Sequence, residues 1–130
     1  MDTQTLLSRV KEEGVKFISL QFTDVTGAVK SVDIPVERFH GALEEGIWFD
    51  GSSVEGFARI QESDMQLVID PNTFAVLPWT KPEFRRARVF CDIYQTESVP
   101  FPGDPRGVLK RMLAIIEQRG WVFNLSLIHI

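Results

Sequence analysis

Cysteine and histidine are scarce in this chain of 130 residues, and their scarcity excludes several kinds of site. The single cysteine, Cys91, rules out an internal disulfide and a four-cysteine zinc site, and it fits a reducing cytoplasm. Its neighbours Phe90 and Ile93 indicate a small buried residue and not a nucleophile. The two histidines, His40 and His129, have no partner in the sequence that would make either one a base or a metal ligand.

Long apolar runs, internal repeats and low-complexity tracts are also absent from the sequence. The longest apolar run is far too short to span a bilayer, and charged residues interrupt the first fifteen positions, so neither a membrane segment nor a targeting segment is expected. The formal charge of −4 is mild, and positive charge gathers only around Arg85 and at Lys110–Arg111, which gives no reason to expect nucleic acid binding. With 44% hydrophobic and 25% charged residues, the composition is that of one globular domain, and we expect it in the cytoplasm.

Hydrophobic periodicity and turn residues predict an α+β arrangement, a five-stranded sheet crossed by one helix. A short helix comes first, capped by Asp2 or Thr3. Pro35 suits the first position of a second helix, which ends at Gly46. The predicted strands are 15–23, 28–34, 65–69, 74–79 and 87–94, with a short segment at 47–49.

A last helix is predicted after the segment 95–103, which is rich in proline and is the best candidate for a linker. Asp104 suits the N-cap of this helix, Pro105 its first position, and Gly120 its end. The apolar stripe of the helix has no partner in the predicted sheet, so it would be exposed unless further sequence covers it. A new strand would begin at 121–123. The stripe consists of Leu109, Met112, Leu113 and Ile116.

The most informative segment is Phe49-Asp50-Gly51-Ser52-Ser53, followed nine residues later by Glu62-Ser63-Asp64. A glycine at this point allows a tight turn from which one carboxylate and two hydroxyls could grip a small cation or a polar ligand. The same residues also suit an ordinary turn, because Asp-Gly favours a type I′ hairpin and serine satisfies local backbone groups. On these residues alone the turn interpretation is favoured, since turn residues far outnumber ligand-binding ones.

This segment is one of six that follow a fixed order along the chain. The others are 15–24 with Gly27, Asp70-Pro71-Asn72-Thr73, Pro78-Trp79-Thr80, Cys91-Asp92-Ile93-Tyr94 and Pro102-Gly103-Asp104-Pro105-Arg106. In this order and spacing they resemble the N-terminal region of type I glutamine synthetases, from about residue 5 to Asn124. The resemblance implies a β-grasp (ubiquitin-like) mixed sheet with a crossing helix, followed by the start of a separate catalytic domain. The implied divisions are an N-terminal helix at 1–14, the β-grasp domain at 15–95, a linker at 96–104, the beginning of a truncated catalytic domain at 105–124 and a non-native tail at 125–130.

The resemblance stops at Asn124, where the family continues into a Gly-Pro-Glu-x-Glu-Phe stretch that supplies its first metal-binding glutamates. The segment 125–130 carries no carboxylate. It looks like a translated adapter joined to a truncated gene, although its alternation would also suit a C-terminal strand.

Glutamine synthetases use ATP with Mg²⁺ or Mn²⁺ to phosphorylate glutamate, and ammonia then displaces the phosphate to give glutamine. The resemblance implies a ring-shaped homo-oligomer in which Asp50 acts in trans, binding ammonium and accepting its proton in the site of a neighbouring subunit. Ser53 matches a position that steadies this loop. Asp64 is expected either to act as a supporting carboxylate or only to begin a strand. Arg59 matches an arginine tied to feedback inhibition by glutamine.

The ATP and metal sites would belong to the catalytic domain, so this piece alone is expected to be inactive, with glutamate, ammonium and ATP bound by the full enzyme. Glu62, Asp70 and Asp92 match no metal-binding spacing. Two alternatives stay open: a stand-alone β-grasp module that docks on a full-length synthetase as a regulator, and a structural domain without related function. The apolar segment after Gly120 argues against the docking module, and the loop at Asp50 argues against the structural domain.

Overall fold

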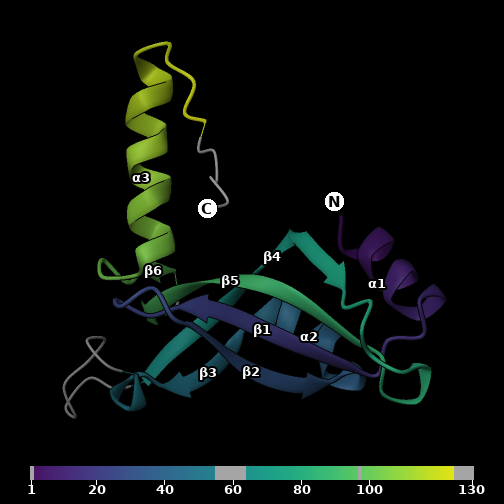
Figure 1. Cartoon of the computed structure of the whole chain (residues 1–130). Coiled ribbons are helices and arrows are strands. Elements are labelled where there is room, and N and C mark those ends of the chain that lie inside the picture. The colour runs from purple at the N-terminus through teal and green to yellow at the C-terminus, as the bar shows by residue number, and fades with distance from the viewer. Residues whose placement is uncertain (1, 55–63, 97, 125–130) are drawn as a thin grey trace, which may run out of the picture.

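The structure, a computed structural model, describes residues 2–54, 64–96 and 98–124 and contains one curled sheet (Figure 1). The strand order is β2-β1-β5-β4-β3, with β6 paired to β5. The strands β1 and β5 run parallel, and the other strand pairs of the described residues are antiparallel. This mixed sheet with a crossing helix confirms the predicted α+β fold of β-grasp type. The strands are β1 (Phe17–Thr23), β2 (Val29–Pro35), β3 (Ile47–Asp50), β4 (Asp64–Val76), β5 (Arg86–Thr96) and β6 (Val99–Pro100).

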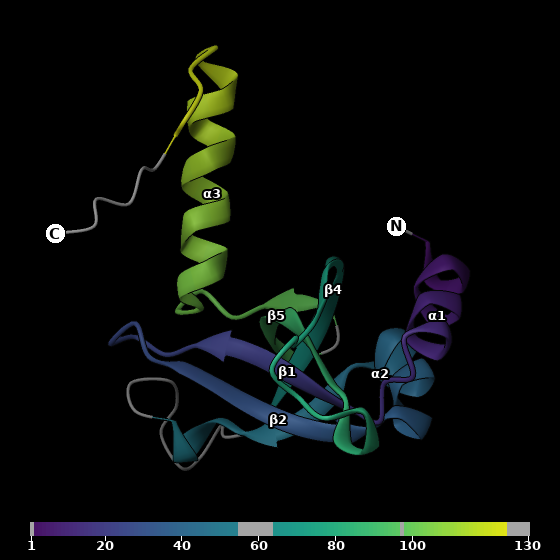
Figure 2. The same cartoon turned by 45° about the vertical axis from the view of Figure 1, so that its right-hand side comes forward.

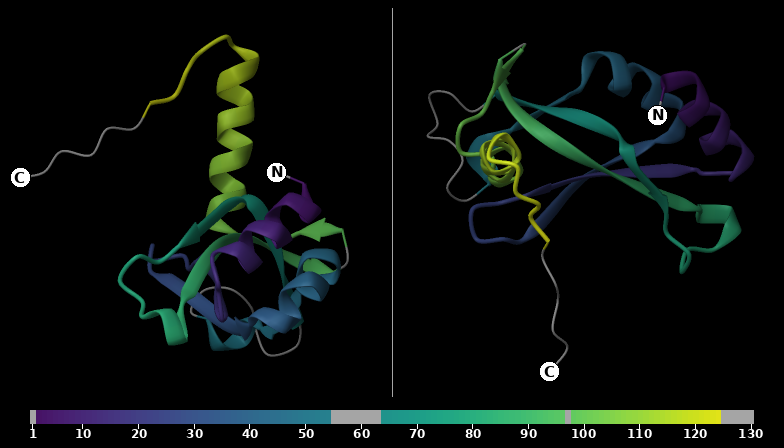
Figure 3. Two further views of the ribbon diagram at one scale, coloured as in Figure 1. Left: turned by 90° about the vertical axis from the view of Figure 1, so that its right-hand side faces the viewer. Right: turned by 90° about the horizontal axis from the view of Figure 1, so that it is seen from above.

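The helices fall into two groups, those that cover the sheet and one that leaves it (Figures 2 and 3). The helices α1 (Thr3–Glu12) and α2 (Phe39–Glu45) contribute side chains to the core, whereas α3 (Pro105–Gln118) projects away from the sheet. Asp2 caps α1 as predicted, because its Oδ1 accepts a hydrogen bond of 2.7 Å from the backbone N–H of Thr5. The short 3₁₀ turns are η1 (Val36–Arg38), η2 (Gly51–Ser53) and η4 (Pro82–Phe84).

One apolar core lies between the sheet and the two covering helices. Because side chains alternate between the faces of a strand, every second residue of a central strand reaches this core. The predicted alternation at Ile18, Leu20 and Phe22 of β1 is confirmed. The other fully or nearly fully buried members include Leu6 and Val10 of α1, Phe39 and Ala42 of α2, Met65, Leu67 and Ile69 of β4, and Val89, Cys91 and Ile93 of β5.

Cys91 is completely buried in this core, and its burial raises the pKa of the thiol to about 12. The thiolate is the reactive form of cysteine, so the folded chain should resist thiol reagents at neutral pH. We expect Ellman's reagent to titrate no thiol in the native chain and one thiol after unfolding in guanidinium chloride. Rapid reaction of the native chain would contradict the burial of this side chain.

The sheet departs from prediction at 70–72, where the sequence pattern predicts a break between two strands. β4 instead runs through this point, and its register with β5 shifts between Asp70 and Ala75. The hydroxyl of Thr73 donates to the carbonyl of Asp70 at 2.7 Å and accepts the backbone N–H of Phe90 at 2.7 Å. A side chain thus replaces ladder hydrogen bonds across the irregularity, and the strand continues past a proline.

Three smaller predictions also differ from the structure. Pro35 ends β2 instead of opening a helix, and α2 begins at Phe39 after the turn η1. The short strand β6 lies inside the segment predicted as a linker and gives the sheet a sixth strand. Residues 121–124 form no strand and are exposed.

Candidate functional site

Asp50 is the last residue of β3, and it lies opposite Asp64, the first residue of β4. The strand β3 is at the edge of the sheet, and both aspartates are exposed. The structure therefore brings two of the predicted site residues together at one end of the sheet. Like charges directly opposite one another on paired strands are destabilising, so the stability of the sheet does not explain this pair.

A local turn orients the carboxylate of Asp50. Its Oδ1 accepts the backbone N–H of Ser52 at 2.9 Å and the hydroxyl of Ser52 at 2.6 Å. The chain turns here through the 3₁₀ helix η2 and not through a type I′ hairpin. Val54 follows the turn and is 8% exposed, which anchors the far side of the turn in the core. An aspartate held in this way presents a carboxylate of fixed orientation at the surface.

The strand that carries Asp50 is itself held closely against the core. The ring of Phe49 packs on that of Phe22, with their centroids 5.1 Å apart. At the start of the strand, Gly46 has φ +69°, and a Cβ atom there would lie 2.7 Å from the carbonyl oxygen of Leu67. Only glycine suits this position, and its close approach seats β3 on β4.

Two predicted site residues fall outside what the structure describes. Arg59 lies outside the described residues, and so does the side chain of Ser53. The steadying role of Ser53 and the feedback role of Arg59 therefore stay predictions.

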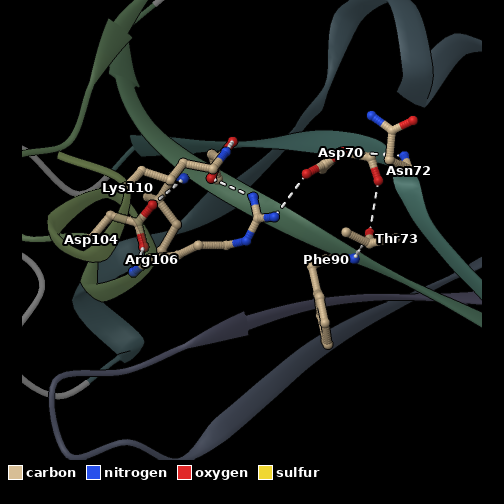
Figure 4. A network of polar contacts seen from close by, with 9 residues as sticks. Asp70, Asn72, Thr73, Phe90, Asp104, Arg106 and Lys110 are labelled. Atoms are coloured by element: carbon tan, nitrogen blue, oxygen red, sulfur yellow. Dashed lines mark hydrogen bonds and ion pairs between the residues drawn. The ribbon is translucent and has the colours of Figure 1, made fainter. Parts of the chain in front are cut away.

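A second polar cluster, which the sequence pattern did not indicate, joins α3 to the sheet (Figure 4). Arg106 donates to Asp70 of β4 at 2.7 Å and to Asp92 of β5 at 2.7 Å, and the ammonium of Lys110 lies 2.6 Å from Asp92. Arg106 and Lys110 are four residues apart, which places them on one side of a helix. That spacing was the only sign of the cluster in the sequence. It does not reveal which carboxylates the two cations contact.

This cluster does not suit a metal ion. Burial raises the pKa of Asp70, but the hydrogen bonds and charge of Arg106, with the N–H of Asn72, outweigh burial and leave it below its usual value. Asp70 and Asp92 are thus carboxylates already neutralised by cationic side chains. Within the part of the chain that the structure describes, no three His, Cys, Asp or Glu side chains converge as a metal site.

In the part of the chain that the structure describes, no helix is both long enough and apolar enough to cross a membrane.

Comparison with known proteins gives consistent matches. Residues 14–96 match the family model for the β-grasp domain of glutamine synthetase. A glutamine synthetase of Thermotoga maritima is 50% identical over 121 residues, which make up 93% of this chain and 28% of the relative. One from Staphylococcus aureus is 47% identical over 117 residues, 89% of this chain and 26% of the relative. The chain therefore spans roughly a quarter of the length of these relatives.

Solved structures share the same arrangement of strands and helices. The GmaS/ADP complex superposes with a TM-score of 0.78 and 28% identity, covering 88% of this chain and 26% of that chain. The cryo-EM structure of Plasmodium falciparum glutamine synthetase superposes with a TM-score of 0.80, covering 92% of this chain and 23% of that chain. At 20% identity, the second match shows the fold alone.

Proposed function

Since the chain belongs to the family of glutamine synthetase β-grasp domains, we propose that it forms the N-terminal part of a ligase that joins ammonia to glutamate. The reaction consumes ATP and passes through γ-glutamyl phosphate. The observation that carries this proposal is the family match over residues 14–96, supported by 50% identity to a glutamine synthetase over nearly the whole chain.

The chemical contribution of this domain is the carboxylate of Asp50. A carboxylate attracts ammonium and can accept its proton once the site closes, so that neutral ammonia attacks the acyl phosphate. The hydrogen bonds from Ser52 to Oδ1 support this role, because they fix the orientation of the carboxylate before ammonium arrives. Asp64, opposite it in the strand pair, adds negative charge near the same place.

We infer that Asp50 serves the site of a neighbouring identical subunit in a ring-shaped oligomer. Its position supports this inference, because it is exposed at the end of an edge strand. A carboxylate at such an edge can reach a partner without any rearrangement of the core.

ATP and divalent metals would be held by the rest of the enzyme, where the metals neutralise the phosphoryl oxygens. Asp70 and Asp92 do not fit a metal, since they are bound to Arg106 and Lys110. The part of the reaction assigned to this domain is therefore the binding and deprotonation of ammonium.

A chimera tests this proposal. In the chimeric synthetase, residues 5–124 of this chain replace the aligned segment of the Thermotoga maritima enzyme. We expect the chimeric synthetase to form glutamine from glutamate, ammonia and ATP, measured by coupled ADP release. An assembled but inactive chimera would overturn the proposal and favour a module that only docks on a synthetase.

The chain by itself should form no glutamine. The resemblance assigns the metal-binding glutamates to the part of the enzyme beyond the matched segment, so we expect residues 1–130 by themselves not to support phosphoryl transfer. The measurement is glutamine formation from ATP, glutamate and ammonia, with the chimeric synthetase as the positive control. Turnover by the purified chain, at a level that follows its concentration, would contradict the assignment of the ATP and metal sites to the rest of the enzyme.

A further inference from the structure

The helix α3 stands almost free of the domain from which it emerges (Figures 1 and 3). None of its residues is buried, and Leu109 and Met112 are 50% and 53% exposed. Ordinary helix packing therefore does not fix the direction of α3. That direction depends on the few contacts at its base.

The first of these contacts holds the start of the helix at one point on β5. Asp104 caps α3, and its Oδ2 accepts the backbone N–H of Ile93 at 3.1 Å. The N–H of Phe101 donates to the carbonyl of the same residue, Ile93, at 2.8 Å. These bonds fix where the helix begins, but bonds to one residue leave its tilt open.

Arg106 supplies the missing constraint. Its two terminal nitrogens contact carboxylates on two different strands, Asp70 of β4 and Asp92 of β5. The side chains of Arg106, Asp70 and Asp92 are 24%, 22% and 21% exposed, so water screens these pairs less than it would at an open surface. A planar guanidinium with two fixed partners has a defined orientation. Lys110, one turn further along α3, contacts Asp92 as well and extends the constraint along the helix.

We propose that Arg106 is a positioning residue that fixes the tilt of α3 on the sheet and so places Asp50 for its role in the neighbouring site. The second half of this statement rests on the proposed function. Asp50 pairs with Asp64, which begins the strand that carries Asp70, so one continuous strand connects Arg106 with the Asp50 end of the sheet.

The length of that strand makes small rotations matter. At about 3.3 Å per residue, Asp64 and Asp70 are roughly 20 Å apart along β4, so a tilt of roughly 5° at Arg106 displaces Asp50 by about 2 Å. Displacements of about 1 Å can cost on the order of a hundredfold in rate when reacting groups must meet. We therefore expect loss of Arg106 to impair the ammonia step by about tenfold or more.

The tilt can be measured in the chain itself. Spin labels on Glu37→Cys and Glu117→Cys report the distance between η1 and α3 by pulsed electron resonance, and buried Cys91 stays unlabelled. We expect one narrow distance distribution, broadened by both Arg106→Ala and Arg106→Lys, since lysine keeps the charge but cannot fork between two carboxylates. Arg111→Ala is the matched control, because Arg111 lies on the same helix but donates to the carbonyl of Pro102 and not to the sheet.

The link to Asp50 is tested in the chimeric synthetase. Arg106→Lys should raise the KM for ammonium and lower ammonia-dependent turnover about tenfold, with γ-phosphoryl transfer to glutamate changed far less. An unchanged distance distribution, or broadening equal to that of Arg111→Ala, would show that Arg106 does not fix the tilt of α3. Broadening together with equal loss of both half-reactions would overturn its role in placing Asp50. Because the distance measurement needs no activity, it shows whether Arg106 fixes the tilt of α3 even if the proposed function is wrong.

Discussion

Replacing Asp50 by alanine in the chimeric synthetase should lower ammonia-dependent glutamine formation by about 10²–10⁴-fold, the range typical of a lost general base. Transfer of the γ-phosphoryl group from ATP to glutamate should change little, because the proposal gives Asp50 no part in that step. The two half-reactions can be separated by measuring acyl phosphate, trapped with hydroxylamine, in the absence of ammonium. An equal loss of both half-reactions would mean that Asp50 only supports the structure.

A matched variant separates the charge of Asp50 from its role in the turn. Asparagine keeps a side-chain oxygen that can accept both bonds from Ser52, so Asp50→Asn preserves the turn η2. It cannot attract ammonium as an anion or accept its proton. We therefore expect Asp50→Asn to be as impaired as Asp50→Ala in the ammonia step. Recovery of activity in the asparagine variant would assign Asp50 to the turn alone.

The core and the end of β3 could be predicted from the sequence because both depend on short-range patterns. Alternation alone places Ile18, Leu20 and Phe22 on one face, whatever the other strands do. The pair Asp50-Gly51 likewise marks a turn through local chemistry. The function of Asp50 did not follow from local chemistry, however, since the sequence does not distinguish a carboxylate that only caps a turn from a catalytic one.

The ion pairs of Arg106 could not be predicted, because its partner carboxylates lie far away along the chain. Asp92 precedes it by 14 residues and Asp70 by 36, and only the antiparallel register of β4 and β5 brings them together. The same reason explains the wrong prediction of a strand break at 70–72. β4 continues past the irregularity through the hydrogen bond between Thr73 and Phe90. These residues are 17 positions apart, so local strand propensity cannot predict the bond.

The largest expected loss of stability comes from Asp104, whose two carboxylate oxygens serve two different elements. Oδ1 caps α3 by accepting the N–H of Arg106 at 3.1 Å, and Oδ2 accepts the N–H of Ile93 at 3.1 Å. Asp104 is only 2% exposed, so alanine would leave a strand N–H unpaired away from water as well as an uncapped helix. We expect Asp104→Ala to lower the free energy of unfolding by about 2–4 kcal/mol, as the sum of a lost cap and an unpaired buried N–H.

A second N-cap aspartate in the same chain provides the control. Asp2 caps α1 through bonds of 2.7 and 2.9 Å to the backbone and hydroxyl of Thr5, but it is exposed, and both bonds stay within the first turn of the helix. Asp2→Ala should therefore cost clearly less than Asp104→Ala when both are measured by urea unfolding of the chain. Equal losses would mean that the bond to Ile93 adds nothing to the cap.

The two caps should also respond to acid in opposite directions. Burial raises the pKa of Asp104 above its usual value near 3.8, against the hydrogen bonds from Ile93 and Arg106. The folded state therefore binds this proton more tightly than the unfolded state, and the stability lost in Asp104→Ala should grow as the pH falls through the raised pKa towards about 3.8. The backbone and side-chain bonds from Thr5 lower the pKa of Asp2, so the loss in Asp2→Ala should shrink as the pH falls below about 3.8. A difference between wild type and Asp104→Ala that narrows in acid would mean that the two N–H donors, and not burial, dominate the environment of Asp104.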